Sequence, residues 1–254
     1  MRRLAELLSR GVVLRRRFSA RFGRVPLLVT PESSLRYWHW SLDRVDPFLL
    51  DLAEEFVGPG DMVWDVGANV GLFAFAAAAR AGPSGRVLAL EPDPLLAGLL
   101  RRSAALDAPA RAPVEVLAVA ADAACGSAEF HISSRGRAAN YLAGGGSSQA
   151  GGSREVILVS TVTLDSLLDR FPAPRFVKID VENLEYRVLQ GASRVLASVR
   201  PIVVCEVCGR AAPLVTRLFH QFGYTLYNAE LPASHRSPLP ATVRNTLACP
   251  AAIG

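Results

Sequence analysis

The chain has no long hydrophobic run. Its longest apolar stretch without a charge, residues 66–79, is 14 residues long and still contains Asn69 and two glycines. A transmembrane helix needs about 20 apolar residues, so we expect no membrane span. A secretory signal is also missing, because Glu6 and Arg10 interrupt any hydrophobic segment of the length that a signal requires. These two absences predict a cytoplasmic protein.

Cysteine and histidine are scarce, with four residues of each in the chain. Four cysteines do not make a dense disulfide framework, which agrees with a reducing compartment. Cys205 and Cys208 form a C-x-x-C pair, but no second pair completes a zinc site, so we predict ordinary cysteines and no metal. His39 and His131 are possible bases, although a lone histidine among aromatic residues is more often packed than catalytic.

Excess positive charge is confined to the start of the chain. The net charge is +5, but the first 30 residues hold eight arginines and one acid, which leaves 20 basic and 22 acidic residues in the remainder. A nucleic-acid enzyme usually spreads basic residues over a face of its folded domain, so this distribution disfavours a nucleic-acid partner.

The arginine-rich start also has apolar residues at helical spacing, namely Leu4, Leu7, Leu8 and Val12. Two interpretations are open. The segment either makes peripheral contact with an anionic membrane surface or is a solvated basic helix that leads into the domain. The solvated helix is the simpler of the two.

Short apolar strands alternate with longer helical stretches from residue 61 onward, a pattern typical of a parallel α/β sheet. The periodicity predicts helices over residues 71–82, 93–106, 184–197 and 211–221. The predicted strands cover residues 62–66, 86–91, 114–119, 127–132, 155–162, 175–180, 201–206 and 224–228.

These elements indicate one domain over residues 45–230, between a basic extension with an aromatic approach segment (1–44) and a proline-rich tail (231–254). Tyr37, Trp38 and Trp40 of the approach segment either stack on an acceptor or cover the sheet edge, and the second is the simpler interpretation. Residues 133–154 contain six glycines and five serines. They predict either a lid or acceptor-contacting loop, or a disordered segment.

Asp65, Gly67 and Gly71 form a D-x-G-x-x-x-G pattern where the first predicted strand meets a helix. Glycine lets the backbone turn tightly and approach a ligand, and the helix start presents free N–H groups. The spacing departs from the G-x-G-x-x-G fingerprint, which disfavours a dehydrogenase. Glu91 ends the next strand, where an acid can accept both hydroxyls of a ribose. The two features together favour a nucleoside-containing cofactor.

Six stretches carry a family resemblance. In chain order they are "MVWDVGANVGLFA", "VLALEPDP", "AVAAD", "VSTVTLDSLL", "FVKIDVENLEYRVLQGA" and "RPIVVCEV". Together they resemble the FkbM family of S-adenosylmethionine-dependent methyltransferases over roughly residues 48–230. The resemblance implies a Rossmann-like class I methyltransferase fold, in which a seven-stranded, mostly parallel sheet has helices on both faces and its last strand is antiparallel. It also implies O-methylation of a hydroxyl on a glycan, glycolipid or secondary metabolite.

The same resemblance assigns site residues. It places Glu91 at the ribose of S-adenosylmethionine, and Ala121 and Asp122 at the adenine. Asn183 stands where the family commonly has glycine, and asparagine tolerates left-handed backbone geometry better than most residues. The residues that the resemblance places around the methionine portion are Asp65, Gly67, Ala68, Asn69 and Gly71.

Asp180 and Glu182 lie at the carboxyl end of a central predicted strand, where this family's acceptor pocket meets the cofactor. Being two residues apart, they can face the same side and orient or deprotonate an acceptor hydroxyl. Glu206 ends the next strand and is a further catalytic candidate. The alternative is that Asp180 and Glu182 only cap the following helix.

Other functions compete with a methyltransferase for a small molecule or glycan. An RNA or protein methyltransferase would use the same cofactor, and a non-catalytic nucleoside-binding module would keep the fold without the chemistry. Degraded acids are expected in such a module, whereas all of these are intact, which favours an enzyme: Asp65, Glu91, Asp180 and Glu182.

Overall fold

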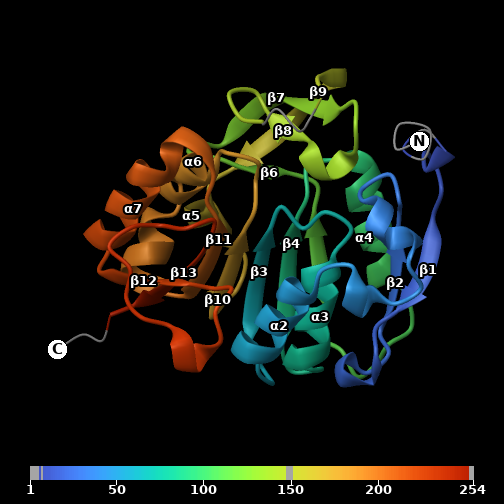
Figure 1. Cartoon of the computed structure of the whole chain (residues 1–254), viewed down its shortest axis with the longest axis horizontal. Helices are drawn as coiled ribbons and strands as arrows, with labels where there is room; N and C mark the ends of the chain where they lie inside the picture. The colour runs from blue at the N-terminus through green and yellow to red at the C-terminus, as the bar shows by residue number, and fades with distance from the viewer. Residues whose placement is uncertain (1–5, 7, 147–150, 252–254) are drawn as a thin grey trace.

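The computed structural model describes residue 6 and residues 8–146 and 151–251. Its centre is a seven-stranded sheet of order β12-β13-β11-β10-β3-β4-β5, with β13 antiparallel to both of its neighbours (Figure 1). This architecture confirms the predicted fold class. The strands are β3 (Met62–Val66), β4 (Arg86–Leu90), β5 (Val114–Leu117), β10 (Phe176–Ile179), β11 (Ile202–Glu206), β12 (Tyr224–Asn228) and β13 (Asn245–Pro250).

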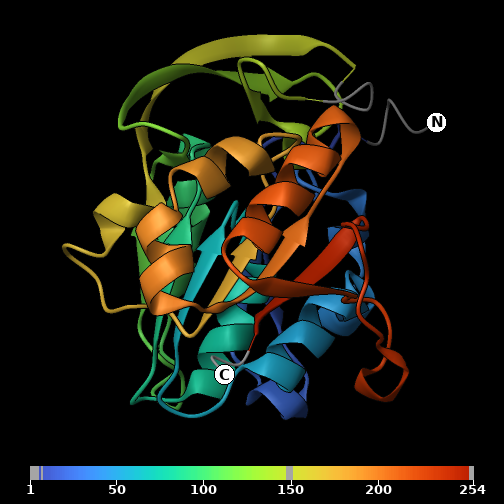
Figure 2. The same ribbon diagram turned by 90° about the vertical axis from the view of Figure 1, so that its left-hand side faces the viewer.

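Helices cover both faces of this sheet (Figure 2). Side chains alternate across a strand, so Val63 packs into one hydrophobic cluster while its neighbour Trp64 packs into the other. Because both faces are covered, β3 is buried along its whole length, which explains its continuous apolar sequence. One face carries α2 (Pro47–Phe56), α3 (Leu72–Ala81) and α4 (Pro94–Ala104), and the other carries α5 (Leu164–Leu167), α6 (Glu185–Gln190) and α7 (Ala212–Gln221).

The predicted domain end at residue 230 is wrong for β13. Residues 245–250 belong to the central sheet, between β11 and β12, instead of to a tail outside the domain. The stretch "NTLACP" shows no strong strand pattern by itself. Its position depends on pairing with β11 and β12, which are distant in sequence.

The N-terminal segment is part of the folded body. β1 (Leu14–Arg17) and β2 (Pro26–Val29) form an antiparallel pair, and Phe18, Phe22 and Leu27 join the hydrophobic cluster around α3. Residues 1–5 and 7 lie outside the described residues, and with them most of the region for which a leader helix was considered. Tyr37 is also buried, whereas Trp38 and Trp40 are exposed and do not cover a sheet edge.

A second, four-stranded sheet lies above one end of the central sheet, at the top of Figure 1. Much of the glycine- and serine-rich segment is ordered beside it, with a short helical turn, η4 (Arg137–Ala139), in its course. Residues 147–150 of that segment lie outside the described residues. The strands of this sheet are β6 (Ala120–Ala121), β7 (Gly126–Ser133), β8 (Tyr141–Leu142) and β9 (Ser153–Val162).

The predicted helix over residues 184–197 is two pieces. After α6 the chain turns at Gly191, and a π-helical segment, η6 (Val195–Val199), follows. A Cβ atom on Gly191 would lie 2.3 Å from the carbonyl oxygen of Asp122, so this close contact has no room for a side chain. Within the described residues, no helix combines the length and apolarity of a membrane span.

Candidate active site

The glycine turn after β3 brings two strand ends into close contact. Gly67 has a φ of 81°, and a Cβ atom there would lie 1.9 Å from the carbonyl oxygen of Asp180, which follows β10. The backbone N–H groups of Gly67 and Ala68 donate to the carbonyl oxygen of Leu90 at 3.0 and 2.9 Å. The turn is thus bonded to the end of β4, and glycine at 67 is required both by φ and by the contact with Asp180.

Glu91, directly after β4, faces this turn. Its Oε2 accepts from the backbone N–H of Asn69, and its Oε1 accepts from that of Asp93, both at 2.8 Å. Burial raises the pKa of Glu91 to about 8, although these two hydrogen bonds act to lower it. Asn69 itself has a φ of 54°, so the backbone of the turn points its N–H at the acid.

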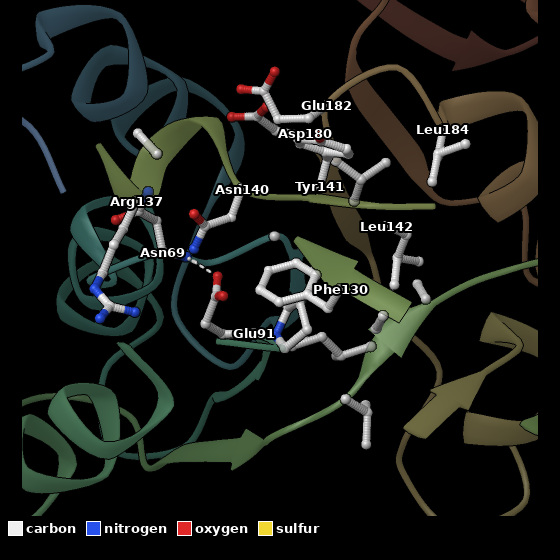
Figure 3. Close-up of a pocket in the computed structure, with 18 residues that line it drawn as sticks. Asn69, Glu91, Phe130, Arg137, Asn140, Tyr141, Leu142, Asp180, Glu182 and Leu184 are labelled. Atoms are coloured by element: carbon white, nitrogen blue, oxygen red, sulfur yellow. Dashed lines mark hydrogen bonds between the residues drawn. The ribbon is translucent and has the colours of Figure 1, made fainter. Parts of the chain in front are cut away.

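A pocket opens between the turn, Glu91 and the small sheet (Figure 3). It brings together six of the predicted residues from four separate segments: Gly67, Asn69, Glu91, Ala121, Asp180 and Glu182. Phe130, Tyr141 and Leu142 contribute an aromatic and aliphatic part, and the wall is completed by Leu90, Pro92, Val119, Ala120, Arg137, Ala138, Asn140, Val181 and Leu184.

Asp122 is not among the residues that line this pocket. Its two carboxylate oxygens accept from Nε and Nη2 of Arg187 on α6, both at 2.7 Å. The bidentate pair holds the Asp122 side chain against α6. Of the two residues assigned to the adenine, only Ala121 reaches the pocket wall.

Asp65 is fully buried at the end of β3, beneath the turn. Nζ of Lys178 lies 3.4 Å from Asp65 Oδ1 and 3.4 Å from Asp180 Oδ2, so one ammonium group lies between two acids. Burial raises the pKa of Asp65, and the positive charge of Lys178 acts in the opposite direction. The pKa of Lys178 is raised because the two acids outweigh its burial.

Glu182 lies in a turn with left-handed backbone, with φ 55° at Glu182 and 74° at Asn183. The carbonyl oxygen of Glu182 accepts from the N–H of Gly146 at 2.9 Å, and Asn183 Nδ2 donates to the Gly146 carbonyl at 2.7 Å. Asparagine therefore adopts the geometry that the family's glycine would have and adds a hydrogen bond. Burial, reinforced by the negative charges of Asp180 and Glu206, raises the pKa of Glu182 to about 7.

Glu206 lies to one side of the pocket. Arg244 donates to its Oε1 from Nη2 at 2.8 Å and from Nε at 3.1 Å. Glu206 lines a neighbouring cavity that also includes Lys178 and Asp180. Its pKa is raised by burial and by Asp180, while Arg244 acts to lower it.

A larger, more open cleft of about 640 Å³ adjoins the pocket. Glu182 and Ala138 line both spaces, so the two meet at these residues. The other cleft residues come mainly from the segment after β2 and from the η4 region, and they include Ser33, Ser34, Leu35, Arg36, Arg135 and Gly136.

Several site residues were not predicted from the sequence. Arg137 lines the pocket and pairs with Asp93 Oδ2 at 2.6 Å and with Glu32 Oε1 at 3.0 Å. Asn140 also donates to Asp93, at 2.7 Å. No sequence spacing indicates these long-range pairs. Lys178 did leave a signal, because it is the single lysine of the chain and lies within an apolar central strand.

The histidines are outside the pocket wall. The ring of His131 stacks on that of Tyr141 with 4.8 Å between centroids, which is a packing role of the kind expected for a lone histidine. His39 accepts from Arg16 through its backbone oxygen. Within the described residues, no group of three or more histidine, cysteine or acidic side chains is arranged to hold a metal ion.

The sheet order, the glycine turn after the first central strand and the acid after the second define the class of S-adenosylmethionine-dependent methyltransferases with a Rossmann-like fold. Residues 65–226 match the family described as the methyltransferase FkbM domain. This match confirms the resemblance found in the sequence, and the chain belongs to that family.

Three known proteins show the range of similarity. The hexuronic acid methyltransferase AglP of Haloferax volcanii is 30% identical over 175 residues, which are 68% of this chain and 65% of that protein. The structure of methyltransferase FkbM from Methylobacillus flagellatus KT is 17% identical, with a TM-score of 0.47, over 78% of this chain and 50% of that one. An O-methyltransferase from Thermotoga maritima is 13% identical, with a TM-score of 0.40, over 80% and 64% of the two chains.

Proposed function

We propose that this protein transfers the methyl group of S-adenosylmethionine to a hydroxyl of a glycan or a related small molecule. The observation that carries the proposal is the position of Glu182. Its carboxyl group lies on the wall shared by the pocket beside Glu91 and the adjoining cleft, and its pKa is about 7. An acid at such a junction can take a proton from an acceptor in the cleft as the methyl group arrives from the pocket.

The residues of the pocket fit the cofactor. The turn at Gly67 leaves the backbone bare, which allows the close approach that a methionine portion needs. Each carboxylate oxygen of Glu91 accepts one backbone N–H and keeps a lone pair for a ribose hydroxyl. Ala121 and Phe130 offer apolar surface to an adenine ring. When bound, the sulfonium of the cofactor supplies the electrophilic methyl group.

The protein's own contribution to the reaction is alignment and proton removal. Asp180 is held by Lys178, which keeps its carboxylate fixed at the junction of the pocket and its neighbouring cavities. Glu182 is the proposed base, because it is ionised in about half of the molecules near pH 7 and accepts a proton readily. Glu206 is bound to Arg244, so we assign it an electrostatic influence on Glu182.

The cleft supports a carbohydrate acceptor with an acidic group. Ser33 and Ser34 offer hydroxyls for hydrogen bonds, while Arg36 and Arg135 offer guanidinium groups that pair well with carboxylates. The similar protein from Haloferax volcanii is a hexuronic acid methyltransferase, whose acceptor has this chemistry. This chain spans 65% of that protein's length, so the acceptor of this chain is part of the proposal.

The test is methyl transfer to matched acceptors, followed by mass spectrometry of the products. The acceptors are a hexuronic acid glycoside, the corresponding neutral hexose glycoside, total RNA and a protein extract. We expect one added methyl group on the hexuronic acid glycoside and less on the neutral sugar. Methylation of RNA or protein alone would refute the proposed acceptor class.

The role of Glu182 is tested with Glu182→Gln, which keeps the shape of the side chain and removes the proton acceptor. Turnover should fall about 10²–10⁴-fold, while calorimetry should show nearly unchanged affinity for S-adenosylmethionine. Glu115→Gln is the matched control, because Glu115 is an exposed acid on β5 and does not line the pocket. Full turnover in Glu182→Gln would leave Asp180 and Glu206 as the remaining candidate bases.

A further inference from the structure

The outermost strand of the N-terminal segment presents arginines together with exposed apolar side chains. Figure 1 shows β1 at the edge of the molecule, beyond β2. On this strand Arg15 and Arg17 are exposed, and Val13 just before it is 39% exposed. Trp38 and Trp40 are 46% and 86% exposed. We call these five residues the β1 surface.

Arg16 connects the two parts of this surface. Its side chain turns inward, donates from Nε to the carbonyl oxygen of His39 at 3.0 Å, and stacks over the ring of Trp40 with 4.7 Å to the centroid. A cation stacked on one face of an indole holds the ring in place. Trp40 is therefore fixed beside β1, although most of its surface faces solvent.

The charges of this surface are not neutralised within the protein. Arg21 nearby is paired with Asp43, Asp51 and Glu54. In the part of the chain that the structure describes, by contrast, no acid forms an ion pair with Arg15 or Arg17. Arg17 donates only to the carbonyl oxygen of Arg24. The β1 surface thus keeps a positive potential available to an external anion.

We propose that the β1 surface binds the surface of an anionic lipid bilayer. Tryptophan is favoured at the boundary between lipid headgroups and hydrocarbon, where its ring is partly buried and its N–H stays hydrated. Arginines beside it pair with lipid phosphates and gain from the negative potential of the membrane. A polyanion such as RNA would engage the arginines but would not explain an indole held almost entirely in solvent.

The position of the acceptor cleft agrees with this orientation. Glu6 and the segment after β2 line the cleft, so it opens toward the same N-terminal part of the molecule. A protein docked by its β1 surface would thereby hold the cleft near the membrane, where acceptors carried on lipids are found. Membrane binding itself does not depend on methyl transfer and is tested without it.

Tryptophan fluorescence offers a direct test, because the chain has three tryptophans and Trp64 is 0% exposed. A blue shift on adding vesicles therefore reports on Trp38 and Trp40. We expect the full chain to bind vesicles of phosphatidylcholine with 30% phosphatidylglycerol, with a blue shift that weakens as salt rises. Vesicles of phosphatidylcholine alone should give little binding.

Two variants separate the roles of charge and aromatic rings. Arg15→Gln with Arg17→Gln should weaken binding to the anionic vesicles by about 25-fold, which corresponds to ~1 kcal/mol per arginine. The charge-matched control is Arg170→Gln with Arg217→Gln, two exposed arginines near α5 and on α7, and it should bind as the parent does. Trp38→Ser with Trp40→Ser should abolish the blue shift and weaken binding several-fold.

Three results would overturn the proposal, provided circular dichroism shows that each variant is folded. The first is binding that is equal for the two lipid compositions. The second is an equal loss of affinity in the control and in the Arg15 and Arg17 variant. The third is a blue shift produced by a homopolymeric RNA but not by vesicles, which would assign the surface to a nucleic acid.

Discussion

Replacing Lys178 by methionine tests the charge arrangement beneath the active site. Lys178 is 5% exposed and holds its ammonium 3.4 Å from the fully buried Asp65. Methionine fills a similar volume but leaves Asp65 without its cation. Removing one partner of a buried ion pair costs roughly 3–5 kcal/mol, whereas the partly exposed pair with Asp180 contributes about 1 kcal/mol at most. Against a total stability of about 5–15 kcal/mol, the variant should fold but be strongly destabilised.

The loss should also depend on pH. Burial raises the pKa of Asp65 above its model value of 3.8, and Lys178 limits that rise, so the variant should have an even higher Asp65 pKa. A carboxyl group whose folded pKa is raised binds its proton more tightly in the folded state. Its cost to stability is absent below the unfolded pKa and grows until the pH passes the folded pKa.

Lys178 itself stays charged across this window, because its pKa lies above the usual 10.5. The deficit of Lys178→Met relative to the parent should therefore widen from pH 5 to pH 8, by at most about 1.4 kcal/mol per pH unit. Urea unfolding followed by circular dichroism measures it. The double variant with Asp65→Asn removes the unpaired charge and should recover much of the loss. An equal deficit at both pH values, or no recovery in the double variant, would refute the reasoning.

Three further predictions concern the pocket and its neighbours. Methyl transfer should rise with pH through about 7 as Glu182 ionises, and Glu206→Gln should move that rise to lower pH because it removes a neighbouring negative charge; a pH–rate profile that loses about 10²-fold or more at every pH would instead make Glu206 the base. Gly67→Ala should abolish cofactor binding in calorimetry, because its Cβ would meet Asp180, whereas Gly82→Ala, which is also at positive φ but in open space, should lower stability by about 1–2 kcal/mol and retain binding. Arg137→Met should lower the melting temperature and raise the KM for the cofactor together, since Asp93 and Glu32 lose their shared cation; an unchanged KM would show that the pair is only structural.

Much of the fold follows from local pattern. Residues 62–66 and 86–90 are apolar because both faces of the sheet are covered, and that burial is visible in the sequence as continuous hydrophobic runs. The turn at Gly67 is visible for a similar reason, since positive φ and a close backbone contact admit only glycine there. Acids at the carboxyl ends of strands converge because parallel strands end at one edge. The sequence alone therefore indicated the positions of Glu91, Asp180 and Glu182.

Other features depend on partners that are far apart in the chain. β13 becomes a strand by pairing with β11 and β12, and nothing in residues 245–250 predicts those neighbours. Asp122 follows the third central strand as predicted, yet Arg187 draws its carboxylate away from the pocket. Arg137 joins the segment after β7 to Asp93, 44 residues earlier. Periodicity records only whether a side chain is buried; which charged group neutralises which, and which strand fills a gap in the sheet, is decided when the folded chain brings distant residues within hydrogen-bond distance.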